Sequence, residues 1–158
     1  MTAPPRLRDA TAADLPALLA LEAGFPGDRL SPRQYRHHLR NPRARLRVAE
    51  ADGVVAGASL VLRRAGSAAA RLYSLVVDPA LRGHGLGRAL VADALALAAA
   101  GGAGRLDLEV RADNAAAIGL YAALGFATVR RLPGYYHDGC DGLRLSRPLA
   151  PGMPKVTR

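Results

Sequence analysis

A glycine-rich segment, residues 76–88, limits the fold more than any other part of the chain. It reads VVDPALRGHGLGR, so a strand stops at Asp78-Pro79, a loop follows, and a helix is expected from Ala89 onward. Glycine tolerates positive φ and lets a ligand approach the backbone closely. Because a helix N-terminus carries free N–H groups and the positive end of the helix dipole, it attracts anions. The segment therefore predicts a phosphate-binding loop between a strand and a helix.

The glycine spacing separates this loop from two common phosphate-binding motifs. No Gly-Lys-Ser/Thr follows it, so it is not a P-loop. Gly83, Gly85 and Gly87 are evenly spaced, so the dinucleotide-binding pattern G-x-G-x-x-G is also absent. The plain alternative is a glycine-rich connection that binds nothing.

The pattern Arg82-x-x-Gly85-x-Gly87 after Asp-Pro resembles the acetyl-CoA motif of the GNAT acetyltransferases. In that family the loop amides hold the CoA pyrophosphate, which implies acetyl-CoA as co-substrate and no metal. The resemblance also implies a backbone N–H donor for the oxyanion at residues 75–77, where a β-bulge separates two parallel strands. The cofactor-binding residues that it implies are Leu75, Val76, Val77, Arg82, Gly83, His84, Gly85, Leu86, Gly87, Arg88 and Asn114.

Two further segments resemble one subgroup of this family, the ribosomal-protein-alanine N-acetyltransferases (RimI-like). Residues 108–126 read LEVRADNAAAIGLYAALGF, and residues 134–143 read GYYHDGCDGL. The resemblance implies that Glu109 accepts a proton from the attacking amine through water, and that Tyr121 donates a proton to the departing thiolate. The residue pattern alone also permits plainer roles. Glu109 would then be a solvent-facing strand residue, and Tyr121 a core residue on a helix face.

The paired tyrosines Tyr135 and Tyr136 before Asp-Gly-x-Asp are characteristic of enzymes of this family that acetylate peptide α-amines. The resemblance therefore implies acetyl transfer to the N-terminal α-amine of a protein or peptide, by direct attack in a ternary complex. Phe25 and Leu30, after the first helix, are expected to wall the acceptor site. In the subgroup this segment is often rich in aromatic residues, whereas here residues 24–30 read GFPGDRL and the chain contains no tryptophan. The ribosomal-protein substrate therefore stays open.

Two other functions fit the same residues. The acceptor could be a small-molecule amine, such as a polyamine or an antibiotic, or the domain could bind CoA or RNA without turnover. The formal net charge is +9, which favours contact with a ribosome or another polyanion. The helix that carries Arg33, Arg36 and Arg40 borders the acceptor site in this fold, so it is expected to select acidic or phosphate-bearing acceptors.

The order of elements predicts an α/β fold with a mixed, mostly antiparallel sheet of six to seven strands, one splayed parallel pair at the cofactor site and about four helices. Three helices are expected after the N-caps Thr11, Ser31 and Asn114, and a fourth ends near Ala100. Strands are expected at residues 6–8, 46–50, 54–62, 71–77, 105–111, 126–132 and 143–145. One domain is expected over residues 1–149, with a disordered tail at 150–158.

The composition indicates a soluble cytoplasmic protein, either a monomer or a homodimer. No segment reaches membrane-spanning length without charge or glycine, and the N-terminus lacks the apolar run of a signal peptide. The single cysteine, Cys140, allows no intramolecular disulfide. His137 and Cys140 are only two candidate ligands in a turn-rich segment, so no metal site is expected.

Overall fold

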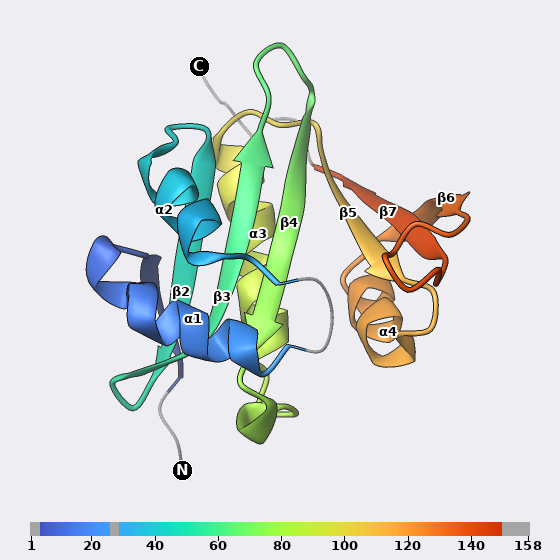
Figure 1. Ribbon diagram of the computed structural model, residues 1–158. Helices are drawn as coiled ribbons and strands as arrows, with labels where there is room; N and C mark the ends of the chain where they lie inside the picture. Colours follow the sequence, from blue (N-terminus) through green and yellow to red (C-terminus); the bar gives the residue numbers. More distant parts are fainter. Residues whose placement is uncertain (1–3, 26–28, 150–158) are drawn as a thin grey trace. The chain divides into compact units, whose positions relative to one another are not determined.

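The computed structural model describes residues 4–25 and 29–149, and the chain can be followed in Figure 1. Within these residues seven strands and four α-helices form. The strands are β1 (Arg6–Asp9), β2 (Ala44–Ala51), β3 (Val54–Arg63), β4 (Ala69–Val77), β5 (Arg105–Arg111), β6 (Ala127–Leu132) and β7 (Gly142–Pro148). The α-helices are α1 (Leu15–Ala23), α2 (Pro32–Arg40), α3 (Leu86–Ala100) and α4 (Ala115–Ala123).

The strands form one mixed sheet in the order β1-β2-β3-β4-β5-β7-β6. β4 and β5 run parallel, whereas β1–β2, β2–β3, β5–β7 and β6–β7 are antiparallel. The expected α/β fold with a mostly antiparallel sheet and one parallel pair is therefore confirmed.

Contacts divide the chain into two units, which are described separately. The first comprises Met1–Leu62 with Tyr73–Ala94, and the second Arg63–Leu72 with Leu95–Arg158. The single domain expected over residues 1–149 stays a prediction. The tail expected at 150–158 lies outside the described residues.

In the first unit, β2 and β3 form the hairpin that Asp52-Gly53 predicts. Asp52 has φ 52° and Gly53 has φ 79°. Positive φ at both central residues is typical of a type I′ turn, whose twist matches that of the flanking strands. The hairpin prediction is therefore confirmed, and β1 extends the sheet by pairing with β2.

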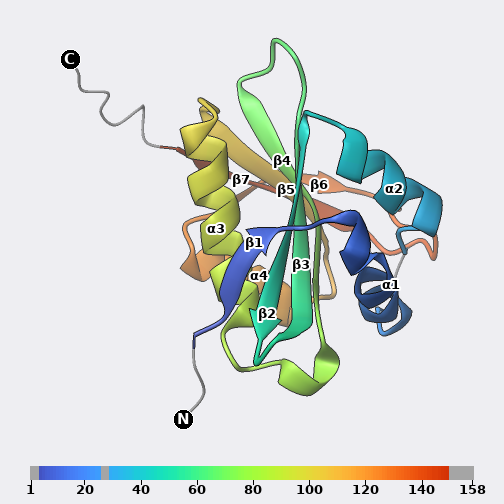
Figure 2. The same cartoon turned by 90° about the vertical axis from the view of Figure 1, so that its left-hand side faces the viewer.

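Helices cover both faces of the β2–β3 part of the first unit. Figures 1 and 2 show α1 and α2 on one face and the first turns of α3 on the other. The α1/α2 cluster consists of Leu18, Leu21, Leu30, Tyr35, Leu46, Val48, Ala58, Leu60 and Val76. The α3 cluster consists of Ala49, Ala56, Leu86 and Leu90.

The start of α2 is held by the capping box that its sequence predicts. Gln34 N–H donates to Ser31 Oγ over 3.1 Å, and Ser31 N–H donates to Gln34 Oε1 over 2.8 Å. Pro32 occupies the first helical position, where its missing N–H costs nothing. These local bonds satisfy two backbone donors that a helix start otherwise leaves free.

A buried carboxylate joins the end of α1 to α2. Glu22 is 5% exposed. Its Oε1 accepts a hydrogen bond from the Leu30 N–H over 2.7 Å, and its Oε2 accepts one from the Tyr35 hydroxyl over 2.6 Å. Burial and the bond to Glu22 raise the pKa of Tyr35 far above its usual value, so this hydroxyl stays a donor. We call these two bonds the Glu22 clamp.

The second unit is built on the parallel pairing of β4 with β5. Ala69–Leu72 pairs in register with Arg105–Leu108, and β7 then pairs with the whole of β5. The parallel ladder ends at Leu72 and Leu108, although β4 continues to Val77 and β5 to Arg111. After β5, Asn114 caps α4 as predicted, with its Oδ1 accepting from the Ala117 N–H over 3.1 Å.

The structure corrects the predicted start of α3. The helix begins at Leu86 rather than Ala89, because Gly85 C=O already accepts the Ala89 N–H over 3.0 Å. Gly87 and Arg88 therefore belong to the first helical turn and not to the loop. Their helical backbone does not follow from propensity, since glycine is a poor helix former.

The Glu22 clamp generates a test of stability. Glu22→Ala leaves the Tyr35 hydroxyl and the Leu30 N–H buried without their partner, so the free energy of unfolding should fall by roughly 2 to 4 kcal/mol. Tyr35→Phe removes one bond and leaves the buried Glu22 Oε2 without that donor, so its cost should be about 1.5 to 3 kcal/mol. Chemical denaturation of both variants measures the difference. Equal, small losses would mean that the clamp contributes little.

Candidate active site

The loop before α3 exposes backbone donors in open space. Gly83 and Gly85 both have φ +83°, and a Cβ built on either would meet no atom within 4 Å. The first-turn amides of α3 have no carbonyl of their own helix to bond. Arg82 and Arg88 are exposed on either side. Open space, free N–H groups, the helix dipole and two guanidiniums fit a pyrophosphate group.

The side chains of β4 change faces part-way along the strand. In a regular strand, residues two apart face the same side of the sheet. Tyr73 faces α2, with its ring centroid 6.1 Å from that of His38. Leu75, two residues later, instead packs against the α3 cluster, and Val76 belongs to the α1/α2 cluster. The alternation therefore reverses between Tyr73 and Leu75, just before residues 75–77, and the β-bulge expected at residues 75–77 stays a prediction.

In the second unit, two arginines hold the carboxylate of Glu109. Its side chain is 8% exposed. Oε1 lies 2.8 Å from Arg71 Nε and 2.7 Å from Arg71 Nη2, and Oε2 accepts from Arg144 Nε over 2.9 Å. Charge-assisted bonds of this kind orient a carboxylate firmly. Glu109 is thus not the solvent-facing strand residue that the bare alternation allowed.

Arg71 also links Glu109 to the paired tyrosines, because its Nη2 lies 3.4 Å from the Tyr135 hydroxyl oxygen. The sequence alone does not reveal Arg71 or Arg144 as partners of Glu109. Arg144 stands directly opposite Glu109 in the β5–β7 register, and Arg71 stands opposite Asp107 in the β4–β5 register. Only the strand pairing brings these charges together.

Tyr121 is packed into the second unit with its proton retained. It is 7% exposed, and its ring meets Phe126 edge-on at 5.6 Å between centroids. Burial, and then the nearby Tyr136, raises the pKa of Tyr121 well above its usual value. Its hydroxyl has no hydrogen bond to any residue in the described ranges. The ring is therefore a packing element, and the hydroxyl is available as a donor.

Tyr135 and Tyr136 form a rigid corner beside the start of β7. Their rings meet edge-on at 5.0 Å, and a Cβ on Gly142 would lie 3.1 to 3.2 Å from atoms of both. The guanidinium of Arg111 lies 5.3 Å from the Tyr136 ring centre. Burial, together with Tyr135 and Glu109, raises the pKa of Tyr136 to about 12. Tyr135 is 44% exposed and offers its ring to solvent.

The predicted site residues divide between the two units. The loop residues, the end of β4, Phe25 and Leu30 lie in the first, and Glu109, Tyr121, Asn114, Tyr135 and Tyr136 lie in the second. Leu30 is 9% exposed, so its side chain supports the α1/α2 cluster, whereas Phe25 is half-buried.

The remaining predictions concern metals and membranes. Among residues 4–25 and 29–149, no group of three or more His, Cys, Asp or Glu side chains is placed to hold a metal ion. No helix in the same ranges has the length and apolar character needed to cross a membrane.

Comparison with known proteins establishes the family. Residues 12–126 match the acetyltransferase (GNAT) family, so the chain belongs to that family. The N-alpha-acetyltransferase RimI of Mycobacterium tuberculosis (strain ATCC 25618 / H37Rv) is 32% identical over 151 residues, which cover 92% of this chain and 94% of that protein.

Two further relatives come from Escherichia coli. The ribosomal protein bS18-alanine N-acetyltransferase of strain K12 is 49% identical over 75 residues, 46% of this chain and 49% of that protein. The crystal structure of the ribosomal-protein-S18-alanine N-acetyltransferase has a TM-score of 0.84 at 27% identity, covering 98% of this chain and 99% of that one. The chain spans only about half of the length, or less, of several curated relatives that it matches.

The open loop yields a binding test with a matched control. Gly85→Ala forces a side chain into positive φ, which costs about 1 to 2 kcal/mol, and places a methyl group where the anion would lie. Gly53→Ala meets the same backbone strain in the β2–β3 turn, at φ +79° with equally open surroundings. Calorimetry should show acetyl-CoA affinity reduced about tenfold or more for Gly85→Ala only. Equal affinities in the two variants would remove the loop from the binding site.

Proposed function

We propose that this protein transfers the acetyl group of acetyl-CoA to the N-terminal α-amine of a protein or peptide. The observation that carries this proposal is the match, over 92% of the chain, to a relative named as an N-alpha-acetyltransferase. The rigid, partly exposed Tyr135–Tyr136 corner supports it, because it offers the ring surface and hydroxyl that a peptide chain needs.

The first unit would hold the co-substrate. The amides of Leu86, Gly87 and Arg88, with the open space at Gly83 and Gly85, fit the CoA pyrophosphate. The reversal of β4 supports a free backbone N–H within residues 75–77 that points at the thioester oxygen. When bound, acetyl-CoA supplies the thioester carbonyl that a neutral amine attacks.

Glu109 would receive the proton of the amine through a water molecule. A carboxylate has about four acceptor positions; two nitrogens of Arg71 contact Oε1, and Arg144 Nε contacts Oε2. A water on the second position of Oε2 could pass the proton on. The two guanidiniums would position the carboxylate so that it meets this water in one fixed orientation.

Tyr121 would return a proton to the departing thiolate. Its raised pKa keeps the phenol protonated at neutral pH. A thiol has a pKa near 8.5, below that of the Tyr121 phenol, so the thiolate is a weaker base than the phenolate. The thiolate therefore accepts the proton only from a close, well-aligned donor. A fixed ring, packed on Phe126, provides that alignment.

Further expectations concern the residues that bind the acceptor peptide and the pantetheine arm of the co-substrate. Phe25, Tyr135 and Tyr136 would contact the peptide, and Asn114 the pantetheine arm. Contact with the ribosome or another polyanion, a cytoplasmic location and a monomeric or homodimeric state stay predictions.

One screen separates the candidate acceptors. Acetyl-CoA is incubated with the protein and with a panel of N-terminal peptides, polyamines and aminoglycosides, and CoA release is measured. Turnover of peptides supports the proposal. Turnover of small amines alone makes the protein a small-molecule acetyltransferase. Binding of acetyl-CoA without any turnover makes it a CoA-binding module.

The role of Glu109 predicts a pH-dependent defect. Glu109→Gln should lower kcat by a factor of order 10² to 10⁴, the usual cost of losing a general base. Because an α-amine has a pKa of about 7.7 to 8.0, it deprotonates unaided at higher pH, and the defect should shrink there. Steady-state rates between pH 6 and pH 9 measure both effects.

Asp107→Asn is the matched control for this variant. Asp107 is a half-buried carboxylate on the same strand, bonded to Arg105 and Ser146. Its loss should change kcat by only about twofold, as for a surface contact. If both variants lose activity equally at every pH, Glu109 is a structural residue.

The role of Tyr121 predicts loss of turnover without loss of structure. Tyr121→Phe keeps the ring on Phe126 and removes only the hydroxyl, so Tm and acetyl-CoA affinity should be unchanged. The value of kcat should fall by a factor of order 10². Normal turnover in a folded Tyr121→Phe variant would show that another group protonates the thiolate.

A further inference from the structure

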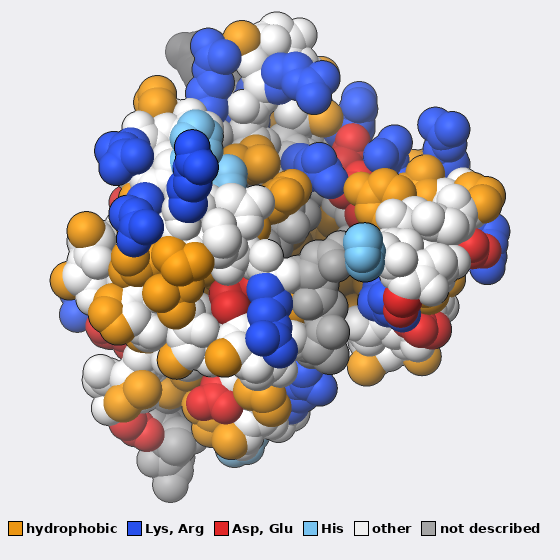
Figure 3. All heavy atoms as spheres, viewed as in Figure 1, with side chains coloured by type: hydrophobic (Ala, Val, Ile, Leu, Met, Phe, Trp, Pro, Cys, Tyr) orange, Lys and Arg blue, Asp and Glu red, His pale blue; other side chains and the backbone are white. Residues whose placement is uncertain are grey.

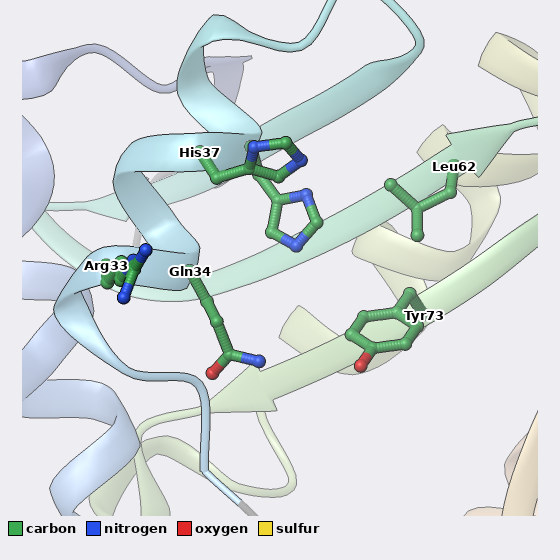
Figure 4. Close-up of a pocket in the computed structure, with 6 residues that line it drawn as sticks. Arg33, Gln34, His37, Leu62 and Tyr73 are labelled. Atoms are coloured by element: carbon green, nitrogen blue, oxygen red, sulfur yellow. The ribbon is translucent and has the colours of Figure 1, made fainter.

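A pocket of about 460 Å³ opens between α2 and the β3–β4 part of the first unit (Figure 4). Its volume is within the range of sites that take small ligands or side chains. α2 contributes only polar or cationic side chains, and the strands contribute an aliphatic and an aromatic one. The lining residues are Arg33, Gln34, His37, His38, Leu62 and Tyr73.

The polar wall of the pocket is rich in donors. Gln34 Oε1 already accepts the Ser31 N–H, so the side-chain amide group of Gln34 remains as a donor, and Figure 4 shows its nitrogen on the side of Tyr73. His38 Nδ1 is buried without a hydrogen-bond partner among the described residues. No carboxylate lines the pocket. Such a wall suits an anion and repels a cation.

The charge outside the pocket has the same sign. Arg33, Arg36 and Arg40 are exposed along α2 and form no ion pair with another described residue. Figure 3 shows the Lys/Arg and His side chains gathered over this helix. Several other arginines are paired with carboxylates, as in the ion pairs of Arg8, Arg47, Arg71, Arg111 and Arg144. The positive field of α2 is therefore left for an outside partner.

The position of the pocket along β4 relates it to the proposed thioester site. Tyr73 precedes Leu75 by two residues and Val77 by four, which is about 7 and about 13 Å along a strand. An extended peptide advances about 3.3 to 3.6 Å per residue. With the α-amine at the thioester, the side chain that reaches the pocket belongs to roughly the third to fifth residue of the acceptor.

We propose that this pocket binds the carboxylate side chain of an acidic residue at the third to fifth position of the acceptor peptide. Arg33 and the Gln34 amide bind the carboxylate, and Leu62 and Tyr73 cover its aliphatic stem. This inference rests on the proposed function and narrows its substrate class to peptides with an acidic residue close to the N-terminus.

The test uses peptides that differ in one charge. They share an N-terminal residue and length, and carry Glu or Gln at the third, fourth or fifth position, or at the far end as a control for general attraction. The KM for the Glu peptide should be about fivefold to tenfold lower at the near positions and nearly equal at the far one. The preference should weaken as salt is raised.

Two variants locate the effect. Arg33→Gln should remove the preference for Glu at the near positions. Arg64→Gln, an exposed arginine in the β3–β4 turn that does not line the pocket, makes the same change in net charge and should keep the preference. Unchanged Tm values in both variants show that the fold is retained.

The outcomes separate this inference from the function beneath it. Peptide turnover with no preference for Glu, or a preference that Arg33→Gln leaves intact, overturns the pocket and leaves α-amine acetylation standing. A preference as strong at the far position assigns it to the general charge of the protein and also overturns the pocket. If no peptide is turned over while small amines are, the proposed function fails and this inference fails with it.

Discussion

A buried carboxylate between two guanidiniums holds the second unit together. Glu109 stands on β5, Arg71 on β4 and Arg144 on β7, so their ion pairs join three neighbouring strands. A charge that is largely removed from water is stable only with its partners in place. A slip of one residue in the register of these strands would separate the charges and flip the alternating side chains. The same interaction sets the candidate proton acceptor and, through Arg71, the position of Tyr135.

β4 combines two tasks that a regular strand cannot. Its first residues pair with β5, and its last residues lie between the α1/α2 cluster and the α3 cluster. The reversal between Tyr73 and Leu75 lets one strand supply an aromatic wall on the α2 side and apolar contacts to α3 two residues later. A backbone that leaves its ladder at this point has polar groups to offer a ligand. The irregularity lies just before residues 75–77, where the proposed thioester site is expected.

Local signals made much of the fold predictable. Asp52-Gly53, the Ser31–Gln34 capping box and the Asn114 cap each act within a few residues, so their outcome follows from short-range chemistry. Contacts between residues that are far apart in the sequence could not be predicted from it. The bond between Glu22 and Tyr35 joins two helices, and the partners of Glu109 come from other strands. The sequence placed the start of α3 at Ala89 because glycine has a low helix propensity, and Gly87 lies in the first turn. The free N–H groups of that turn, which suit an anion, give a reason for a helical glycine there that propensity does not.

The Glu22 clamp has a consequence for how such proteins diversify. It connects the end of α1 to Leu30, just before α2, and to Tyr35 within α2, so these buried bonds offset part of the entropic cost of closing the segment between the helices. Substitutions of side chains that do not contact Glu22 leave these two bonds in place. If the segment between the helices takes part in recognition of the acceptor, a lineage could change that recognition without changing Glu22 or its two bonds. One buried side chain, Glu22, would then preserve the arrangement of the two helices while recognition changes.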